Sequence, residues 1–226
     1  MIQIVFENEN FVVCDKPSGV LTTPSRYEAE DNRMCLGVEL QNQLRQQIFP
    51  IHRLDFEVSG LVLFAKNANA HKKGNVWFEL KQVQKTYRAV TCNQRFDHIP
   101  ESVPNKREFF ALKEGQTFEW RSRLLRGKRR AYESPQGKPS LTTAVFLEKN
   151  NQDLVWDLNP VTGRAHQLRF ELSRHGFPIH GDSLYGSCID CGANKISLRS
   201  YKVDFTRAPG AEALGLPPVI AVSAAP

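Results

Sequence analysis

The sequence lacks any run of about 18 apolar residues, so no segment predicts a membrane-spanning helix. Its start, MIQIVFE, has neither the basic residues nor the apolar core of a signal peptide, and we therefore expect a cytoplasmic protein. Glycine-rich nucleotide-binding motifs are missing, as is a defensible Ser-His-Asp order. These absences predict chemistry that uses no cofactor.

Cysteine is scarce and scattered, with five residues at positions 14, 35, 92, 188 and 191. Without an export signal they are expected to be free thiols in a reducing compartment. Cys188 and Cys191 have the spacing of half a zinc site, but no second pair of ligands lies beside them in the sequence. His175 and His180 are candidates only in principle, and the sequence predicts no metal site.

Length and composition are compatible with one large domain or two small ones, because the chain has 226 residues and is 41% hydrophobic. The net charge of +6 is compatible with a polyanionic partner but does not establish one. No repeat or low-complexity block divides the chain. We expect one mixed α+β catalytic domain over residues 1–206. The Ala-, Gly- and Pro-rich segment 207–226 is expected to be a poorly ordered tail.

Residue periodicity predicts several elements. Leu36, Leu40, Leu44 and Ile48 recur at every fourth position, which is typical of an amphipathic helix that ends before Pro50. A second helix is expected over 67–82, with Val76, Trp77 and Leu80 facing inward. Strands are expected over residues 2–6, 11–14, 61–65, 85–90, 118–125, 142–147 and 154–158.

The most informative stretch is HRLDFEVSGLVLFAK, residues 52–66. It places Asp55 two residues after Arg53 in a polar turn, directly before an apolar run that predicts a buried strand. Such a strand fixes a neighbouring loop residue while the loop stays accessible. An Asp beside cations remains ionised, which suits a nucleophile or a base. The turn alone is equally consistent with an ion-paired loop carboxylate.

A second polar segment, TGRAHQLR at 162–169, predicts a turn and then a helix that ends at Gly176. His166 and Arg169 are three residues apart and would share a face of that helix. Arginines at the start of a helix suit a phosphate or a carboxylate, although an exposed basic helix is an equal alternative. The basic cluster RGKRR at 126–130 is either a nucleic-acid contact or a solvated loop.

Taken together, these motifs resemble the RluA-like family of RNA pseudouridine synthases. The signature is His52-Arg53-Leu54-Asp55 with Ser59-Gly60 and Ala65-Lys66. Further family motifs follow the family order at residues 16–19 with Pro24, 85–87, 162–169, 176–186 and 196–200. The resemblance covers residues 11–205 and implies an α+β fold with a mixed, mainly antiparallel central sheet flanked by helices. Because Lys16-Pro17 lies so early, we expect a compact member without an amino-terminal S4 module.

The resemblance also implies an activity, the isomerisation of uridine to pseudouridine in transfer or ribosomal RNA without a metal or a cofactor. Asp55 matches the family's essential aspartate, which attacks the nucleoside at the sugar or at the uracil ring. Arg169 matches the arginine that pairs with this aspartate. Tyr87 matches a tyrosine whose ring stacks on the uracil and whose hydroxyl assists removal of the C5 proton.

Substrate binding is assigned by the same resemblance. A uridine in folded RNA must be flipped out of its stack, and Arg53 matches the residue that fills the gap. His52 is expected to shape the turn, and Leu198 with Ile196 to form an apolar floor under the base. Phosphate contacts are expected from Lys16, Arg164 and residues 126–130.

Three positions depart from the family pattern. Val58 replaces a residue that is usually Thr, Ala165 one that is usually Thr or Ser, and Glu171 a usual His. None of these removes a chemical group assigned above. They bear on the shape of the RNA site, to which Glu171 is expected to add negative charge.

Two alternatives remain at this point. One is a non-catalytic RNA-binding or RNA-chaperone protein with the same fold. The joint presence of Asp55, Tyr87 and Arg169 argues against it. The other is a glycoside-processing or phosphoryl-transfer enzyme, which would need a second carboxylate or a metal cluster beside Asp55. Glu57 is close in sequence, but an extended loop would not place it across a substrate. We expect the protein to act as a monomer.

Overall fold

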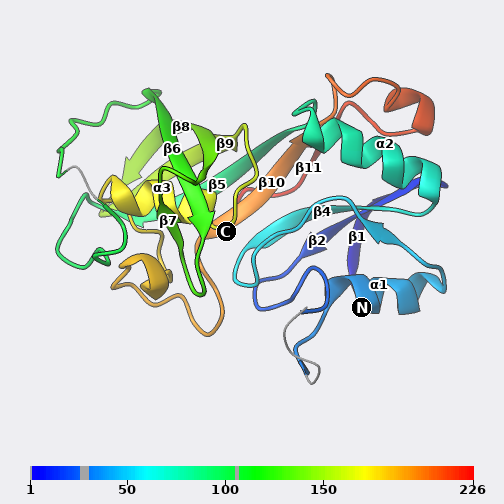
Figure 1. The fold of residues 1–226 in the computed structure, drawn as a ribbon, viewed down its shortest axis with the longest axis horizontal. Coiled ribbons are helices and arrows are strands. Elements are labelled where there is room, and N and C mark those ends of the chain that lie inside the picture. Colours follow the sequence, from blue (N-terminus) through cyan, green and yellow to red (C-terminus); the bar gives the residue numbers. More distant parts are fainter. Residues whose placement is uncertain (1, 26–30, 105–106) are drawn as a thin grey trace. The chain divides into compact units, whose positions relative to one another are not determined.

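The computed structural model describes residues 2–25, 31–104 and 107–226 (Figure 1). Its helices are α1 (Leu36–Leu44), α2 (Ala68–Glu79) and α3 (Gln167–Arg174), with 3-10 helices η1 (Ser183–Tyr185) and η2 (Glu212–Leu214). Its strands are β1 (Gln3–Glu7), β2 (Phe11–Lys16), β3 (Phe49–Pro50), β4 (Ser59–Ala65), β5 (Gln84–Cys92), β6 (Thr117–Arg126), β7 (Ala131–Glu133), β8 (Lys138–Asn150), β9 (Asp153–Pro160), β10 (Leu198–Asp204) and β11 (Val219–Ala221). Among the helices of these residues, none is long and apolar enough to cross a membrane.

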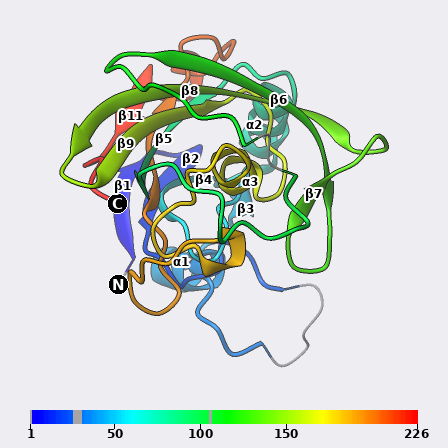
Figure 2. The same ribbon diagram turned by 90° about the vertical axis from the view of Figure 1, so that its left-hand side faces the viewer.

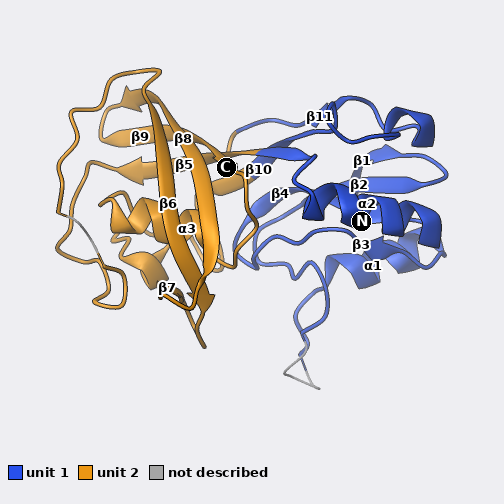
Figure 3. Cartoon of the chain, turned by 45° about the horizontal axis from the view of Figure 1, so that its top comes forward, with its two compact units in different colours: residues 1–85, 200–224 blue, residues 86–199, 225–226 orange. Residues whose placement is uncertain are grey.

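The chain forms two compact units, which Figure 3 colours separately. Unit 1 consists of Met1–Lys85 and Ser200–Ala224, and unit 2 of Thr86–Arg199 and Ala225–Pro226. Because a compact unit need not fold alone, one catalytic domain over residues 1–206 stays a prediction. The predicted α+β class with a mainly antiparallel sheet is confirmed by the strand pairings within each unit.

Unit 1 is built on antiparallel strands in the order β1-β2-β4, with β3 also paired to β4. The apolar run of the sequence forms β4, which is buried at every residue. Alternate side chains of β2 and β4 point to opposite faces. One face packs against Trp77 of α2, while Phe64 on the other face lies against Gly37 of α1 (Figure 1). The two helices thus cover opposite sides of these strands.

Gly60 is required where β4 begins. Its φ is +114°, a conformation that side-chain-bearing residues rarely adopt, and an added Cβ would overlap the backbone of Ser200 in β10. The glycine therefore permits the close approach of β4 and β10 just after the Asp55 turn.

Both helices of unit 1 differ from prediction in detail. The helix expected to reach Ile48 ends at Leu44, because the backbone of Arg45 is left-handed with φ 51°. On α2, Trp77 is buried at 3% exposure but Val76 is 42% exposed, and Leu80, which directly follows the helix, is 60% exposed. Neighbouring helical residues point about 100° apart, so Val76 and Trp77 cannot both face the strands.

Residues 207–226 are not the poorly ordered tail that their composition predicts. Strand β11 pairs antiparallel with β10, placing Ile220 opposite Val203. Four residues of the segment are buried in the core of unit 1: Ala208, Ala211, Leu216 and Ile220. The indole N–H of Trp77 also donates to the carbonyl of Pro209 at 3.0 Å. Long-range burial, which composition does not report, orders this segment.

Unit 2 is built on antiparallel strands in the order β5-β9-β8-β6-β7. Helix α3 is buried at every residue and lies against the inner side of these curved strands (Figure 2). Trp156 of β9 forms the centre of an aromatic cluster, with ring centroids 4.9 Å from Phe177 and 5.2 Å from Phe146. The exposed basic helix considered from the sequence is therefore excluded, because α3 is a core element.

Candidate active site

Asp55 lies in the turn between β3 and β4, which is hydrogen-bonded to the loop that follows β2. The backbone N–H of Gly19 donates to the carbonyl of Phe56 at 2.9 Å. The Thr22 hydroxyl donates to the Leu54 carbonyl at 3.0 Å and accepts from the Leu54 N–H at 3.1 Å. These bonds fix the backbone on both sides of Asp55, whose side chain is half-buried.

Lys16 holds the same turn from inside. Its side chain is fully buried, and its ammonium donates to the carbonyls of Pro17 at 3.0 Å, Val20 at 2.8 Å and Phe56 at 3.2 Å. Burial lowers the pKa of Lys16 to about 8, although the charges of Asp55 and Glu57 oppose this shift. All three ammonium protons are used, so the predicted contact of Lys16 with an RNA phosphate is wrong. Lys16 positions the Asp55 turn instead.

His52 and Arg53 precede Asp55 and differ in exposure. The Nε2 atom of His52 accepts from the backbone N–H of Leu63 at 3.1 Å, and its ring stacks on Phe78 with centroids 4.9 Å apart. Burial first, and then the charge of Lys85, lower the pKa of His52 to about 3. This neutral, packed ring agrees with a role in shaping the turn. Arg53 is exposed, as a residue that contacts RNA must be.

Arg169 of α3 is buried beside a carboxylate that the sequence did not reveal as its partner. Its Nε and Nη2 atoms donate to the two oxygens of Asp182, at 2.7 and 2.8 Å, and both side chains are at most 2% exposed. The guanidinium also lies 5.3 Å from the ring centroid of Tyr185. These contacts fix the guanidinium in one orientation. The pairing of Arg169 with Asp55 stays a prediction.

The backbone places His166 outside the predicted helix. It has a left-handed conformation, with φ 53°, and α3 begins one residue later. The predicted helical face shared by His166 and Arg169 is therefore wrong. Before His166, the half-buried Arg164 donates from Nε to the Pro139 carbonyl at 2.9 Å.

Tyr87, Ile196 and Leu198 are buried residues of unit 2. Tyr87 is 7% exposed on β5, opposite Leu158 of β9. Ile196 and Leu198 are 2% and 3% exposed. Their predicted contact with a base stays a prediction.

Glu171 does not add charge to an RNA surface. Its side chain is fully buried in α3, where the carboxylate accepts a hydrogen bond from the Ser122 hydroxyl. Its other oxygen lies 3.9 Å from Nε2 of His175. The expectation of negative charge at the RNA site is therefore wrong, because the carboxylate points into unit 2.

Part of the basic cluster is available for binding. Arg126, Lys128 and Arg129 are exposed around the turn between β6 and β7. Arg130 instead donates from Nε to the Leu184 carbonyl at 2.6 Å, which ties this turn to the 3-10 helix η1.

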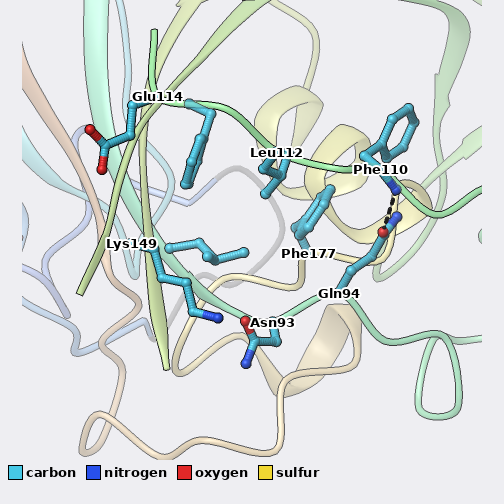
Figure 4. Close-up of a pocket in the computed structure, with 9 residues that line it drawn as sticks. Asn93, Gln94, Phe110, Leu112, Glu114, Lys149 and Phe177 are labelled. Atoms are coloured by element: carbon cyan, nitrogen blue, oxygen red, sulfur yellow. Dashed lines mark hydrogen bonds between the residues drawn. The ribbon is translucent and has the colours of Figure 1, made fainter. Parts of the chain in front are cut away.

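Unit 2 also contains a pocket of about 310 Å³ that none of the predicted site residues lines (Figure 4). Phe110 and Phe177 contribute to its apolar wall, with Asn93 and Lys149 among its polar lining residues. Gln94 accepts from the backbone N–H of Phe110 at 2.9 Å. Because its polar side chains are mostly committed or exposed, the pocket does not by itself indicate a ligand.

Comparison with known proteins settles the family. The model of the RNA pseudouridylate synthase family matches residues 10–174, a stretch that contains Asp55, Tyr87 and Arg169. The chain belongs to the RNA pseudouridylate synthase family. Within it, the similar proteins include RluA and its relatives, so the predicted RluA-like membership is confirmed.

Three family members illustrate the relationship. An uncharacterised RNA pseudouridine synthase of Helicobacter pylori J99 is 33% identical over 200 residues, which cover 87% of this chain and 63% of the relative. Ribosomal large subunit pseudouridine synthase C of Haemophilus influenzae is 29% identical over 94% of this chain and 63% of its own length. The dual-specificity RNA pseudouridine synthase RluA of Vibrio vulnificus is 31% identical over 81% of this chain and 68% of its own length. The chain thus spans under two thirds of the first two relatives.

Solved structures of the family agree with the fold. Human RNA Pseudouridylate Synthase Domain Containing 1 superposes with a TM-score of 0.67 at 25% identity, covering 92% of this chain and 79% of that protein. The human Domain Containing 4 protein superposes with a TM-score of 0.66 at 18% identity, which is a likeness of fold.

Proposed function

We propose that this protein isomerises uridine to pseudouridine in ribosomal or transfer RNA, with Asp55 as its covalent catalyst. The observation that carries the proposal is the Asp55 turn, which lies within the segment matched by the family. Thr22 fixes this turn through buried hydrogen bonds with Leu54, and the buried Lys16 donates to the Phe56 carbonyl of the turn, while the Asp55 side chain is only half-buried. A fixed carboxylate that a substrate can reach suits covalent catalysis.

In the proposed reaction, the N1–C1′ bond of uridine breaks, the uracil turns, and C5 joins C1′. The proton of C5 leaves and N1 gains a proton, so the product is an isomer of the substrate. Asp55 attacks either the sugar at C1′ or the uracil ring, and it is released when the new C–C bond has formed. Neither route needs a redox step.

Arg169 and Tyr87 complete the proposed catalytic set. Arg169 would aim the Asp55 carboxylate, a role supported by the fixed orientation that Asp182 gives its guanidinium. Tyr87 would stack on the uracil and assist proton removal from C5. The proposal requires these two residues and Asp55 to act on the same nucleoside.

RNA would be bound by base flipping. Exposed Arg53 would occupy the gap left by the uridine, while buried Leu198 and Ile196 would contact the base. Arg164 and the exposed cations of residues 126–130 would bind phosphates. The names of relatives that modify the ribosomal large subunit, or that are dual-specificity enzymes, support RNA as the substrate.

The test is tritium release from bulk ribosomal and transfer RNA labelled at uridine C5. We expect the protein to release tritium, and we expect Asp55→Asn, which preserves side-chain size, to reduce release by at least about 10³-fold. Glu57→Gln removes another carboxylate of the same turn and should retain release. Thermal unfolding would confirm that both variants fold.

Two outcomes would contradict the proposal. Undiminished release by Asp55→Asn would remove Asp55 from the chemistry. Binding of RNA without release from any labelled RNA would favour the non-catalytic RNA-binding protein.

A further inference from the structure

Cys92 and His180 bring two metal-binding atoms together inside unit 2. The Sγ atom of Cys92, the last residue of β5, lies 3.1 Å from Nε2 of His180. His180 is 8% exposed, and the Cys92 side chain is half-buried. This contact lies outside the proposed catalytic residues and has no role in the proposed reaction.

Backbone hydrogen bonds fix this pair. The His180 N–H donates to the Val90 carbonyl at 3.0 Å, and the Ser197 N–H donates to the His180 carbonyl at 2.9 Å. The Val90 N–H in turn donates to the Ser197 carbonyl at 3.0 Å. The backbone of His180 is therefore held between β5 and the segment before β10.

The loop that carries Cys188 and Cys191 lies against the same place. The Gly181 N–H donates to the carbonyl of Ile189 at 2.9 Å, one residue from His180. A Cβ built on Gly181 would lie 3.0 Å from Cβ of Cys191, and Sγ of Cys191 lies 3.5 Å from the Ser197 hydroxyl. The fold thus brings Cys191 close in space to the backbone next to His180.

Electrostatics agree with this proximity. The pKa of Cys92 is raised mainly by burial and then by Asp153, with further increases from Cys188 and Cys191 and a decrease from Arg95. Asp153 also lies 3.7 Å from Nε2 of His180.

We propose that Cys92, His180, Cys188 and Cys191 bind one Zn²⁺ as a structural site of unit 2. Three thiolates and one imidazole form a ligand set that zinc takes in tetrahedral structural sites, and the Cys-x-x-Cys spacing is typical of them. Zinc–ligand bonds of about 2.3 Å to sulfur and about 2.0 Å to nitrogen put a sulfur and a nitrogen about 3.5 Å apart. The observed 3.1 Å between Cys92 and His180 needs little adjustment.

Metal binding requires a local movement of the loop. Among the residues that the structure describes, no three His, Cys, Asp or Glu side chains already converge on one point. Cys188 is exposed, and Gly192 has φ +91° with no atom within 4 Å of an added Cβ. The proposal requires the sulfurs of Cys188 and Cys191 to turn toward Cys92 and His180 by a movement of this loop.

The site would stabilise residues used by the proposed reaction. His180 is two residues before Asp182, which orients Arg169, and the loop leads to Ile196 and Leu198. Bound zinc would tie Cys188 and Cys191, in the middle of this loop, to His180 at its start. Metal content can be measured without RNA, so the inference can fail while the proposed isomerase activity stands.

The test uses the full chain, reduced with a phosphine and stripped of metal, and titrated with Co²⁺ and then Zn²⁺. We expect one Co²⁺ per chain with the absorption of tetrahedral thiolate coordination, and its displacement by one Zn²⁺. We expect three single substitutions, Cys92→Ser, Cys188→Ser and His180→Ala, each to weaken Co²⁺ binding. The loss should exceed about 10–100-fold, which is the effect of removing a residue that only orients a metal ligand. The exposed Cys188 gives a ligand variant whose folding is not at risk.

Cys14→Ala and Cys35→Ala are the matched controls, because these free cysteines lie in unit 1 and should leave cobalt affinity and spectrum unchanged. Three results would overturn the proposal. They are the absence of stoichiometric metal binding, cobalt absorption without a thiolate contribution, and a Co²⁺ affinity that Cys188→Ser and His180→Ala leave unchanged.

Discussion

Lys16 shows how a single residue can be assigned to the wrong partner from sequence. A lysine in a basic protein suggests a phosphate contact, but here its ammonium is buried and donates to three carbonyls. Lys16→Met would leave those acceptors unsatisfied, and we expect a loss of at least about 2 kcal/mol in the free energy of unfolding. Because Phe56 belongs to the Asp55 turn, turnover should fall more than RNA affinity. Urea denaturation and separate kcat and KM values measure both effects.

Lys72→Met is the matched control for Lys16→Met, since Lys72 is an exposed lysine of the same unit. It should leave stability and turnover within error. Full stability of Lys16→Met together with weaker, less salt-sensitive RNA binding would restore the phosphate contact and contradict the buried role.

His52 makes a pH-dependent contribution to stability. Its pKa is about 3 in the folded protein and 6.5 as the ordinary value. Between these values the unfolded chain binds more protons, so stability falls as pH falls from 6.5 toward 3. We expect His52 to account for a loss of about 2 kcal/mol between pH 6.5 and 4.5, at most about 1.4 kcal/mol per pH unit.

Urea denaturation at the two pH values measures this loss. His52→Phe removes the titration while keeping an aromatic ring against Phe78, so its stability should depend less on pH by that amount. His98→Phe, at a side chain that is 51% exposed, should follow the parent protein. Parallel pH curves for the parent and His52→Phe would show that the ring titrates normally.

The site residues divide into those that local sequence predicts and those that it does not. The Asp55 turn is predictable because a polar turn and the apolar strand after it are adjacent in the chain. The burial of Lys16 and Glu171 is not, since their partners Phe56 and Ser122 come from other segments. The same holds for Asp182, a lone carboxylate in a turn-rich loop until the fold places it against Arg169.

At the scale of elements, the period and alternation of apolar residues predict that a helix or strand exists. They predict less well where that element ends and which of its faces is buried. The apolar run 61–65 lies within the fully buried β4, and the alternating segment 118–125 lies within β6. The periodic segment at 36–48 is a shorter helix, because Arg45 adopts a left-handed backbone that the pattern does not encode. The segment after residue 206 is ordered by partners distant in sequence, which composition cannot report.

That C-terminal segment should contribute to the stability of unit 1. Ile220 of β11 is 5% exposed in the core, whereas its neighbour Val219 is 40% exposed. We expect Ile220→Ala to lower the free energy of unfolding by about 2–5 kcal/mol, through lost burial and the cavity left behind. Val219→Ala, in the same short strand, should cost less than about 1 kcal/mol. Equal, small effects in urea denaturation would show that the segment does not contribute to the core.

At the scale of the whole molecule, we expect RNA binding to depend more on where the positive charges lie than on the net charge. The chain carries +6, which by itself would attract any polyanion weakly. Lys128 and Arg129 are exposed in one turn of unit 2, while Lys72 and Lys73 are exposed on α2 of unit 1. Neutralising either pair lowers the net charge from +6 to +4, since each substitution of Gln removes one positive charge. The two double variants therefore have the same net charge.

If the turn that carries Lys128 and Arg129 contacts RNA phosphates, only the variant that neutralises these two residues should alter the salt dependence of RNA binding. Each lost phosphate contact reduces the slope of log affinity against log salt concentration by about 0.7–0.9. We expect Lys128→Gln/Arg129→Gln to reduce the slope by about 1.5 and Lys72→Gln/Lys73→Gln to leave it nearly unchanged. Binding of transfer and ribosomal RNA across a salt series measures both slopes. Equal slopes in all three proteins would identify residues 126–130 as a solvated loop, whereas equal reductions in both variants would trace RNA attraction to net charge alone.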